Sequence, residues 1–173
     1  MARLVKGPFS LKWGENAILD VSELTFNYDV ATNDYQTVQG TTYTVEGAIT
    51  ASIEITLLKT DVAALATIFP QYYVAKGAKL STGETVTADD GAIDIVAASC
   101  DTTNTNYNLD ITACTGDVTR LVNARTALSS VELADNSLRT VTVTFRGEPE
   151  IDTETGKTVG IIQFFEEGGI EES

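Results

Sequence analysis

The sequence contains no histidine, a single tryptophan and only three prolines. Histidine is the commonest general base and metal ligand, so its absence excludes Ser-His and Cys-His nucleophile arrangements. Cysteine is also scarce. Cys100 and Cys114 form no CxxC pair, and either a disulfide or two free thiols fits them, with free thiols favoured where no secretion signal precedes the chain. We therefore expect no catalytic site, no metal site and no cofactor.

Long apolar runs are missing as well. No stretch approaches the ~18 consecutive apolar residues of a membrane span, and residues 1–14 lack the apolar run and cleavage site of a secretory signal. The sequence therefore predicts a soluble protein, made in the cytoplasm and without a membrane partner. A length of 173 residues fits one domain.

Positive charge is absent from large parts of the chain, whose net charge is −14. Residues 13–58 and residues 80–119 each contain seven acidic side chains and no Lys or Arg. From Glu148 onward, the sequence has eight acidic residues and a single basic residue, Lys157. Such a surface cannot hold nucleic acid by counterion release. DNA near this protein is expected to be repelled.

What the sequence has in abundance is threonine, with 26 residues, and a β-branched side chain favours strands. Apolar and polar residues alternate over 9–13, 23–30, 48–57 and 140–146, which predicts strands. Later strands are expected over 127–133 and 158–164, with turns at 135–136 and 154–157. Each strong strand has one apolar and one polar face, as in antiparallel sheets. The fold class is therefore mainly β, an antiparallel β-sandwich or barrel.

Three segments depart from this pattern. Residues 59–69 have apolar side chains at helical spacing, which predicts one flanking helix of about three turns with Thr60 as N-cap and Pro70 as its end. Residues 31–47 are polar but carry Tyr35, Val38 and Tyr43, and we interpret them as a long extended β-arm. Residues 80–119 alternate short apolar pieces with acidic turns and are expected to be an insertion.

The polar faces of two strands are the most informative feature. Glu23, Asn27 and Asp29 on one strand, with Ser52 and Glu54 on another, predict a solvated acidic surface. This surface is either an ordinary outer face or the wall of a channel inside a closed ring. A register error of one residue would reverse the assignment.

Other interpretations are weaker. Asp152-x-Glu154-x-Gly156 partly matches a calcium loop but lacks the later bidentate Glu, so a solvated turn is favoured. Carboxylate pairs for glycoside hydrolysis arise by chance among 25 acidic residues. The aromatic residues are expected in the core rather than on a sugar-binding platform.

The order of these features resembles the major tail tube proteins of tailed bacteriophages, a superfamily that includes the type VI secretion tube protein. The resemblance rests on AILDVSELTFNYD, TVQGTTYTVEG, ITASIEITLLKTDVAALATIFP and NARTALSSVELADNSLRTVTVTFRGEPEIDTETGK, about two thirds of the chain. It implies a single tail-tube domain over residues 1–173, with residues 31–47 as an inter-ring arm and residues 80–119 as the insertion. It further implies that hexameric rings stack into a hollow conduit for DNA ejection.

The resemblance also implies partners and roles. Glu23, Asp29, Ser52 and Glu54 would face the lumen, and Tyr35, Val38 and Tyr43 would carry ring stacking. The partners would be further copies of the chain, a tape-measure protein, tail terminator and baseplate proteins and a sheath protein, with DNA passing without specific binding. The site of action would be the virion tail, assembled in the host cytoplasm. Two alternatives remain open: a type VI secretion-like tube protein and a monomeric β-sandwich that binds carbohydrate.

Overall fold

The computed structural model describes residues 2–96, 105–148, 150–157 and 159–171. Its elements are β1 (Phe9–Trp13), β2 (Asn16–Ile18), β3 (Val21–Gln36), β4 (Thr42–Leu57), α1 (Val62–Ile68), a 3₁₀ turn (Pro70–Tyr72), β5 (Tyr73–Val74), β6 (Ala92–Ile93), β7 (Asn106–Ala113), β8 (Asp117–Glu132), β9 (Thr140–Gly147) and β10 (Ile162–Glu166). None of the helices in this part of the chain has the length and apolar character needed to cross a bilayer.

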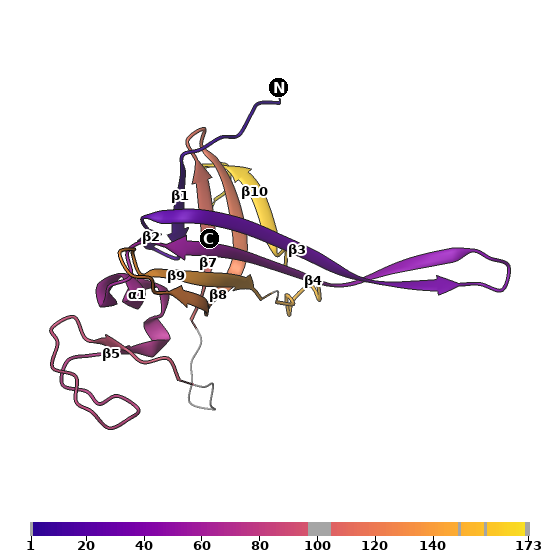
Figure 1. The fold of residues 1–173 in the computed structure, drawn as a ribbon. Helices are drawn as coiled ribbons and strands as arrows, with labels where there is room; N and C mark the ends of the chain where they lie inside the picture. Colours follow the sequence, from indigo (N-terminus) through magenta and orange to yellow (C-terminus); the bar gives the residue numbers. More distant parts are fainter. Residues whose placement is uncertain (1, 97–104, 149, 158, 172–173) are drawn as a thin grey trace.

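The main sheet is antiparallel and eight-stranded, in the order β2-β1-β7-β8-β9-β4-β3, with β10 also paired to β8. It bends into two layers, so that β3, β4 and β9 cross β1, β7 and β10 at a steep angle (Figure 1). The predicted mainly β, antiparallel fold with one helix and a long arm is confirmed. Of the two predicted forms the barrel is wrong for the described residues, because β2 and β3 remain the two ends of an open sheet.

Strand β8 belongs to both layers. Its first half pairs with β7 and β10, and its second half pairs with β9. At the junction Asn123 has a left-handed backbone with φ of 53°, and its side-chain amide donates to the carbonyl of Glu148 at 2.8 Å. Strands that pass between layers turn at such bends, and Asn tolerates this backbone conformation better than most residues.

The core lies between the two layers. It is formed by the apolar faces of β1, β4, β7, β8 and β9 together with the end of α1, and its fully buried large side chains are Trp13, Phe69, Phe145, Ile53, Ile55, Ile68, Leu109, Leu121 and Val143. The indole of Trp13 donates to the carbonyl of Ala124 at 3.1 Å. This bond satisfies the one polar atom that a buried tryptophan introduces.

The helix differs from its prediction in length and in its cap. α1 has seven residues, and its N-cap is Asp61, whose carboxylate accepts from the Ala64 backbone N–H at 3.2 Å. Thr60, the predicted cap, is buried and donates to the Arg139 carbonyl at 3.1 Å. The side chain of Thr60 therefore fixes the helix to the start of β9, and the next polar residue is left to cap the helix.

Residues 80–119, expected as an insertion, fall into two structural parts. Residues 73–96 stand outside the main sheet and contain the two-stranded β5–β6 ladder and an isolated bridge between Lys79 and Thr85. Strand β7, by contrast, lies inside the main sheet between β1 and β8. Its apolar residues Leu109 and Ile111 are buried in the core. Cys100 lies outside the described residues, and Cys114 is an exposed free thiol.

Candidate functional site

The four predicted channel residues lie on one face of the layer that contains β3, β4 and β9. In the β3–β4 ladder Thr25 pairs with Glu54 and Asn27 pairs with Ser52, so these positions share a face with Glu23 and Asp29. The opposite face carries the buried residues of β4. The structure therefore brings Glu23, Asp29, Ser52 and Glu54 together on the outer face of the sheet.

This outer face continues across β9 and β8, and much of it is made of hydroxyl groups. The ladder aligns Glu54 with Thr144 and Thr56 with Thr142. The hydroxyls of Thr56 and Thr142 lie 3.3 Å apart, and Thr144 donates to the Ser129 hydroxyl at 3.3 Å. Neighbouring threonines thus satisfy one another while keeping the surface polar.

Two arginines also lie on this face, and neither was among the predicted channel residues. Arg146 pairs with Ser52 on β4 and with Arg125 on β8. Arg125 is half-buried and forms an ion pair with Glu148, with its Nε 3.0 Å from the carboxylate. The surface is therefore less uniformly acidic than expected. The alternation over residues 140–146 places Arg146 on the polar side of its strand, whereas the position of Arg125 depends on the register of β8.

The outer layer ends in two unpaired edges. Among the described residues, Val21–Gln36 of β3 pairs only with β4, and residues 126–132 of β8 pair only with β9. An exposed edge presents unpaired backbone N–H and C=O groups that template further strand addition. The layer β8-β9-β4-β3 is thus open on both sides.

The arm is the outer half of the β3–β4 hairpin, and it projects away from the body (Figure 1). Its tip is an ordered turn in which the Thr37 N–H donates to the Thr41 carbonyl at 2.7 Å and Gly40 has φ of 90°. Tyr35 and Tyr43 are cross-strand partners, 60% and 61% exposed, and Val38 at the tip is fully exposed. All three predicted stacking residues therefore lie on the projecting part.

The apolar face of the hairpin changes sides within the arm. Val30 pairs with Ile49, but the next pair is Thr32 with Glu46, so one residue of β3 stands opposite two of β4. Such a bulge turns the strand over relative to its sequence alternation. Beyond it Tyr35, Tyr43 and Val45, here named the arm patch, lie on the side of the polar outer face. Gly47 in the strand is the sequence signal for this bulge.

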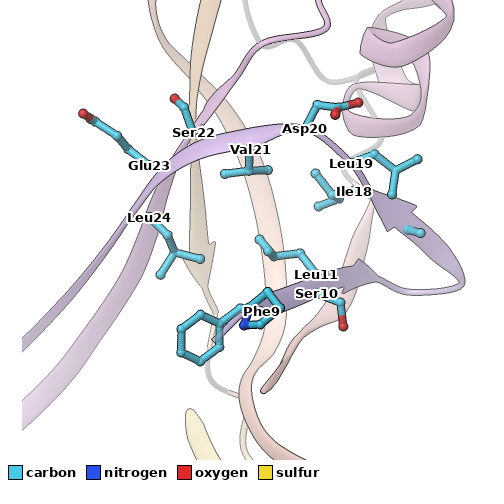
Figure 2. Close-up of a pocket in the computed structure, with 12 residues that line it drawn as sticks. Phe9, Ser10, Leu11, Ile18, Leu19, Asp20, Val21, Ser22, Glu23 and Leu24 are labelled. Carbon is cyan, nitrogen blue, oxygen red and sulfur yellow. The ribbon is translucent and has the colours of Figure 1, made fainter. Parts of the chain in front are cut away.

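Two apolar grooves border β3. The larger, here named the N-terminal groove, has a volume of about 640 Å³ and lies between β1–β2 and the start of β3. Its apolar side chains include Phe9, Leu11, Ile18, Val21 and Leu24. Figure 2 shows Phe9, Leu11, Val21 and Leu24 around the gap between β1 and β3, with Ser22 and Glu23 pointing away.

The second groove, here named the arm-root groove, lies where the arm leaves the body. It has a volume of about 540 Å³ and is lined by Phe26, Tyr28, Ile49, Ile161, Ile162 and Phe164. Phe164 is 79% exposed. The expectation that the aromatic residues outside the arm serve the core is wrong for Phe9, Tyr28 and Phe164, which are exposed.

The described residues contain no group of three or more His, Cys, Asp or Glu side chains placed to hold a metal ion. In the turn that partly matches a calcium loop, the Asp152 carboxylate accepts from the backbone N–H groups of Glu154 and Thr155. These bonds lower the pKa of Asp152, as expected for a carboxylate that stabilises its own turn.

The N-terminal segment is tied to the body by an exposed ion pair. The Arg3 guanidinium lies 3.1 Å from the Asp117 carboxylate and 3.3 Å from that of Glu166. A hydrogen bond from Thr115, followed by the bond from Arg3, lowers the pKa of Asp117. The segment before β1 is thereby held beside β8 and β10.

Comparison with solved structures shows what this architecture resembles. The chain is similar to the sheath/tube terminator of an extracellular contractile injection system, PVC, with a TM-score of 0.53, 11% identity and coverage of 94% of this chain and 98% of that one. It is also similar to a chain of the PVC sheath-tube complex, with a TM-score of 0.51, 11% identity and coverage of 90% and 87%. A third is the tube-terminating cap of the anti-feeding prophage, with a TM-score of 0.51, 11% identity and coverage of 94% and 93%.

No protein-family model matches the chain, and no curated protein matches its sequence. At 11% identity the structural similarity establishes the fold and not the activity. The resemblance to tail tube proteins, which the sequence indicated through the order of its strands, arm and helix, is confirmed at that level. The chain has the fold of the tail tube type.

Proposed function

We propose that this protein is a structural subunit of a phage or phage-like tail tube, in which hexameric rings stack into a hollow conduit for DNA ejection. The observation that carries the proposal is the outer layer β8-β9-β4-β3, which has a polar face and an unpaired strand at each edge. Joining these edges between copies removes both and closes a ring. No catalytic step is part of this role.

The strand directions fit such a closure. Each neighbouring pair in the layer is antiparallel, so β3 and β8, its first and last strands, run in opposite directions. Pairing the β3 edge of one copy with the β8 edge of the next therefore continues the antiparallel pattern around the ring. A layer with an odd number of strands would force one parallel junction in each subunit.

The polar face would then line the channel. Glu23, Asp29 and Glu54 would present carboxylates to the lumen, and Ser52 and the threonines would present hydroxyls. Carboxylates repel a phosphate backbone, so DNA would pass without specific binding. Arg125 and Arg146 would lower the repulsion at one level of the wall.

The arm through Tyr35, Val38 and Tyr43 would connect successive rings. Further partners would be a tape-measure protein inside the tube, tail terminator and baseplate proteins at its ends, and a sheath protein around it. The protein would act in the tail of the particle after assembly in the host cytoplasm. The similarity to chains of tube–sheath and terminating complexes supports these partners.

Negative-stain electron microscopy of the purified protein at low and high concentration tests the proposal. Hollow rods or six-fold rings with a stain-filled centre are expected, and rods should lengthen with concentration. Small uniform particles at all concentrations, together with a monomer mass by light scattering, would contradict it.

Deleting residues 33–42 tests the role of the arm. The deletion leaves Thr32 and Tyr43 to close a short loop next to the Thr32–Glu46 pair, so the body should fold as before. We expect a folded protein with unchanged circular dichroism that forms no tubes. Tubes of normal length from this deletion would contradict the assignment of the arm.

A tube terminator is the second candidate function. Two of the similar structures are a sheath/tube terminator and a tube-terminating cap, and this chain covers 98% and 93% of their chains. A terminator would form one ring that binds the end of a tube and does not stack on itself. The concentration series separates the two functions, because single rings that never lengthen would favour the terminator.

A further inference from the structure

We propose that the arm patch of one copy docks into the N-terminal groove of a second copy in the next ring. The inference rests on the proposed function, because it requires that copies stack. It assigns the receiving surface for Tyr35, Tyr43 and Val45. This surface is the gap between β1–β2 and the start of β3 that Figure 2 shows.

The N-terminal groove is a built apolar surface that stands open. Leu11 and Ile18 at its floor are buried and belong to the core, whereas Phe9 and Leu24 at its rim are 54% and 41% exposed. Its volume of about 640 Å³ is that of a binding cleft, roughly 300–1,000 Å³. Covering it with aromatic side chains would extend the core outward and remove the exposed rim from water.

The arm patch cannot reach the groove of its own chain. The groove contains the first residues of β3, while Tyr35 lies near the other end of the same strand. Eleven residues of strand separate Leu24 from Tyr35, a span of roughly 36 Å at ~3.3 Å per residue. Because β3 is paired with β4 along this length, the hairpin cannot fold back, and the occupant must come from another copy.

Patch and groove at opposite ends of one strand give a head-to-tail contact. A contact between two different surfaces of the same chain is not self-complementary, and it produces an open stack where the operation that relates the two copies does not close into a ring. The arm-root groove lies beside the base of the arm, at the end from which the arm leaves. An arm that extends into the next ring would therefore meet the opposite end of the next copy. That end carries the N-terminal groove.

Charge does not oppose this pairing. Of the two acidic residues that line the groove, Asp20 is ion-paired with Lys59 at 2.9 Å, and Glu23 points away from the gap (Figure 2). Arg3 adds no free positive charge beside the groove, because it is paired with Asp117 and Glu166. The match between the arm patch and the groove is therefore apolar.

Photo-crosslinking in assembled protein tests the inference. Tyr43 is replaced by p-benzoyl-phenylalanine, which keeps an aromatic ring in the patch, and labelled and unlabelled copies are mixed so that adducts between copies are recognised by mass. We expect adducts on residues 8–11 or 18–24 of another copy. The matched control places the same probe at Thr44, which faces the opposite side of the arm beside Asp34, and should give no such adduct.

Two charge variants give an independent readout. Phe9→Glu should leave a folded protein that forms rings but no rods, whereas Phe164→Glu, which places the same charge in the arm-root groove, should still form rods. Rods that survive Phe9→Glu, or adducts on residues 161–164 in place of 8–11, would overturn the inference and leave the proposed function standing. A wild-type protein that never assembles would overturn both.

Discussion

The two halves of the β3–β4 hairpin share one ladder and have different environments. In the body half, Ile53 and Ile55 of β4 are fully buried in the core, together with Phe145 and Val143 of β9 and the layer that contains β1 and β7. In the arm half, Tyr35 and Tyr43 are mostly exposed and the other face carries Thr and acidic side chains. The body half is stabilised by core packing. The arm half depends on strand pairing and its turn.

The difference in burial between the two halves indicates that the arm half serves contacts with other molecules. A two-stranded ribbon is only marginally stable by itself in water, yet the arm carries exposed aromatic residues beyond the reach of its own core. Such a surface marks an interaction site when it is contiguous. The contrast between the halves yields four predictions about the isolated chain, each measured as a change in unfolding.

The largest effect is expected in the body half. Phe145→Ala removes a fully buried ring that packs edge-on against Trp13 with ring centroids 5.8 Å apart. Such a cavity should cost about 3–5 kcal/mol of unfolding free energy, measured by urea denaturation. A loss below about 1 kcal/mol would show that the body is not held by this core.

A smaller effect is expected where the helix joins the sheet. Thr126 is buried and its hydroxyl donates to the Ile68 carbonyl at the end of α1, at 2.9 Å. Thr126→Val should cost about 0.5–1.5 kcal/mol, because it removes the buried bond to Ile68 and the longer bond that Gln71 donates to the hydroxyl at 3.5 Å. The matched control is Thr142→Val on the outer face, where the half-buried hydroxyl has a single longer contact, at 3.3 Å to that of Thr56. An equal loss in both would contradict the stated role of Thr126.

In the arm half, truncation should hardly change stability. Tyr35→Ala removes one member of a cross-strand pair with Tyr43, which is worth about 0.2–1 kcal/mol. The urea midpoint should therefore stay near the wild-type value while rod formation falls. A cost like that of Phe145→Ala would mean that the arm packs on its own body and would break the comparison.

The smallest effect concerns pH. Hydrogen bonds from Thr115 and Arg3 lower the pKa of Asp117, so its stabilising contribution is present above the unfolded pKa, near 3.9, and is lost as pH falls through the folded value. Asp117→Asn should therefore narrow the difference between urea midpoints at pH 7 and pH 3. Arg3 is exposed and Asp117 is half-buried, so the change should be slight and should weaken in high salt.

Much of the fold could be predicted because strict alternation leaves little choice. Residues 48–57 alternate throughout, and the odd-numbered residues from Ala51 to Leu57 are buried in the core. The common face of Glu23, Asp29, Ser52 and Glu54 followed from the same alternation, because each strand puts its apolar side in the core. The helix cap was wrong because the choice between Thr60 and Asp61 depended on a bond to Arg139, 79 positions away.

Other features of the site depended on contacts that alternation does not encode. Arg125 reached the outer face through the bend of β8 at Asn123, and the two unpaired edges appeared only once every strand had its partners. The grooves likewise arise where separate strands approach and leave a gap. Pairing partners and bends are long-range choices, and residues far apart in the chain decide them together.

The arm shows the division most clearly. In β4 every odd-numbered position from Tyr43 to Leu57 except Gly47 is apolar, so the sequence by itself determined that this segment is a strand with one apolar side. The bulge beside Gly47 decided that Tyr43 and Ile53 lie on opposite faces. Local alternation fixes which residues of a strand lie together, whereas the pairing register, set by the partner strand, decides where that face turns over.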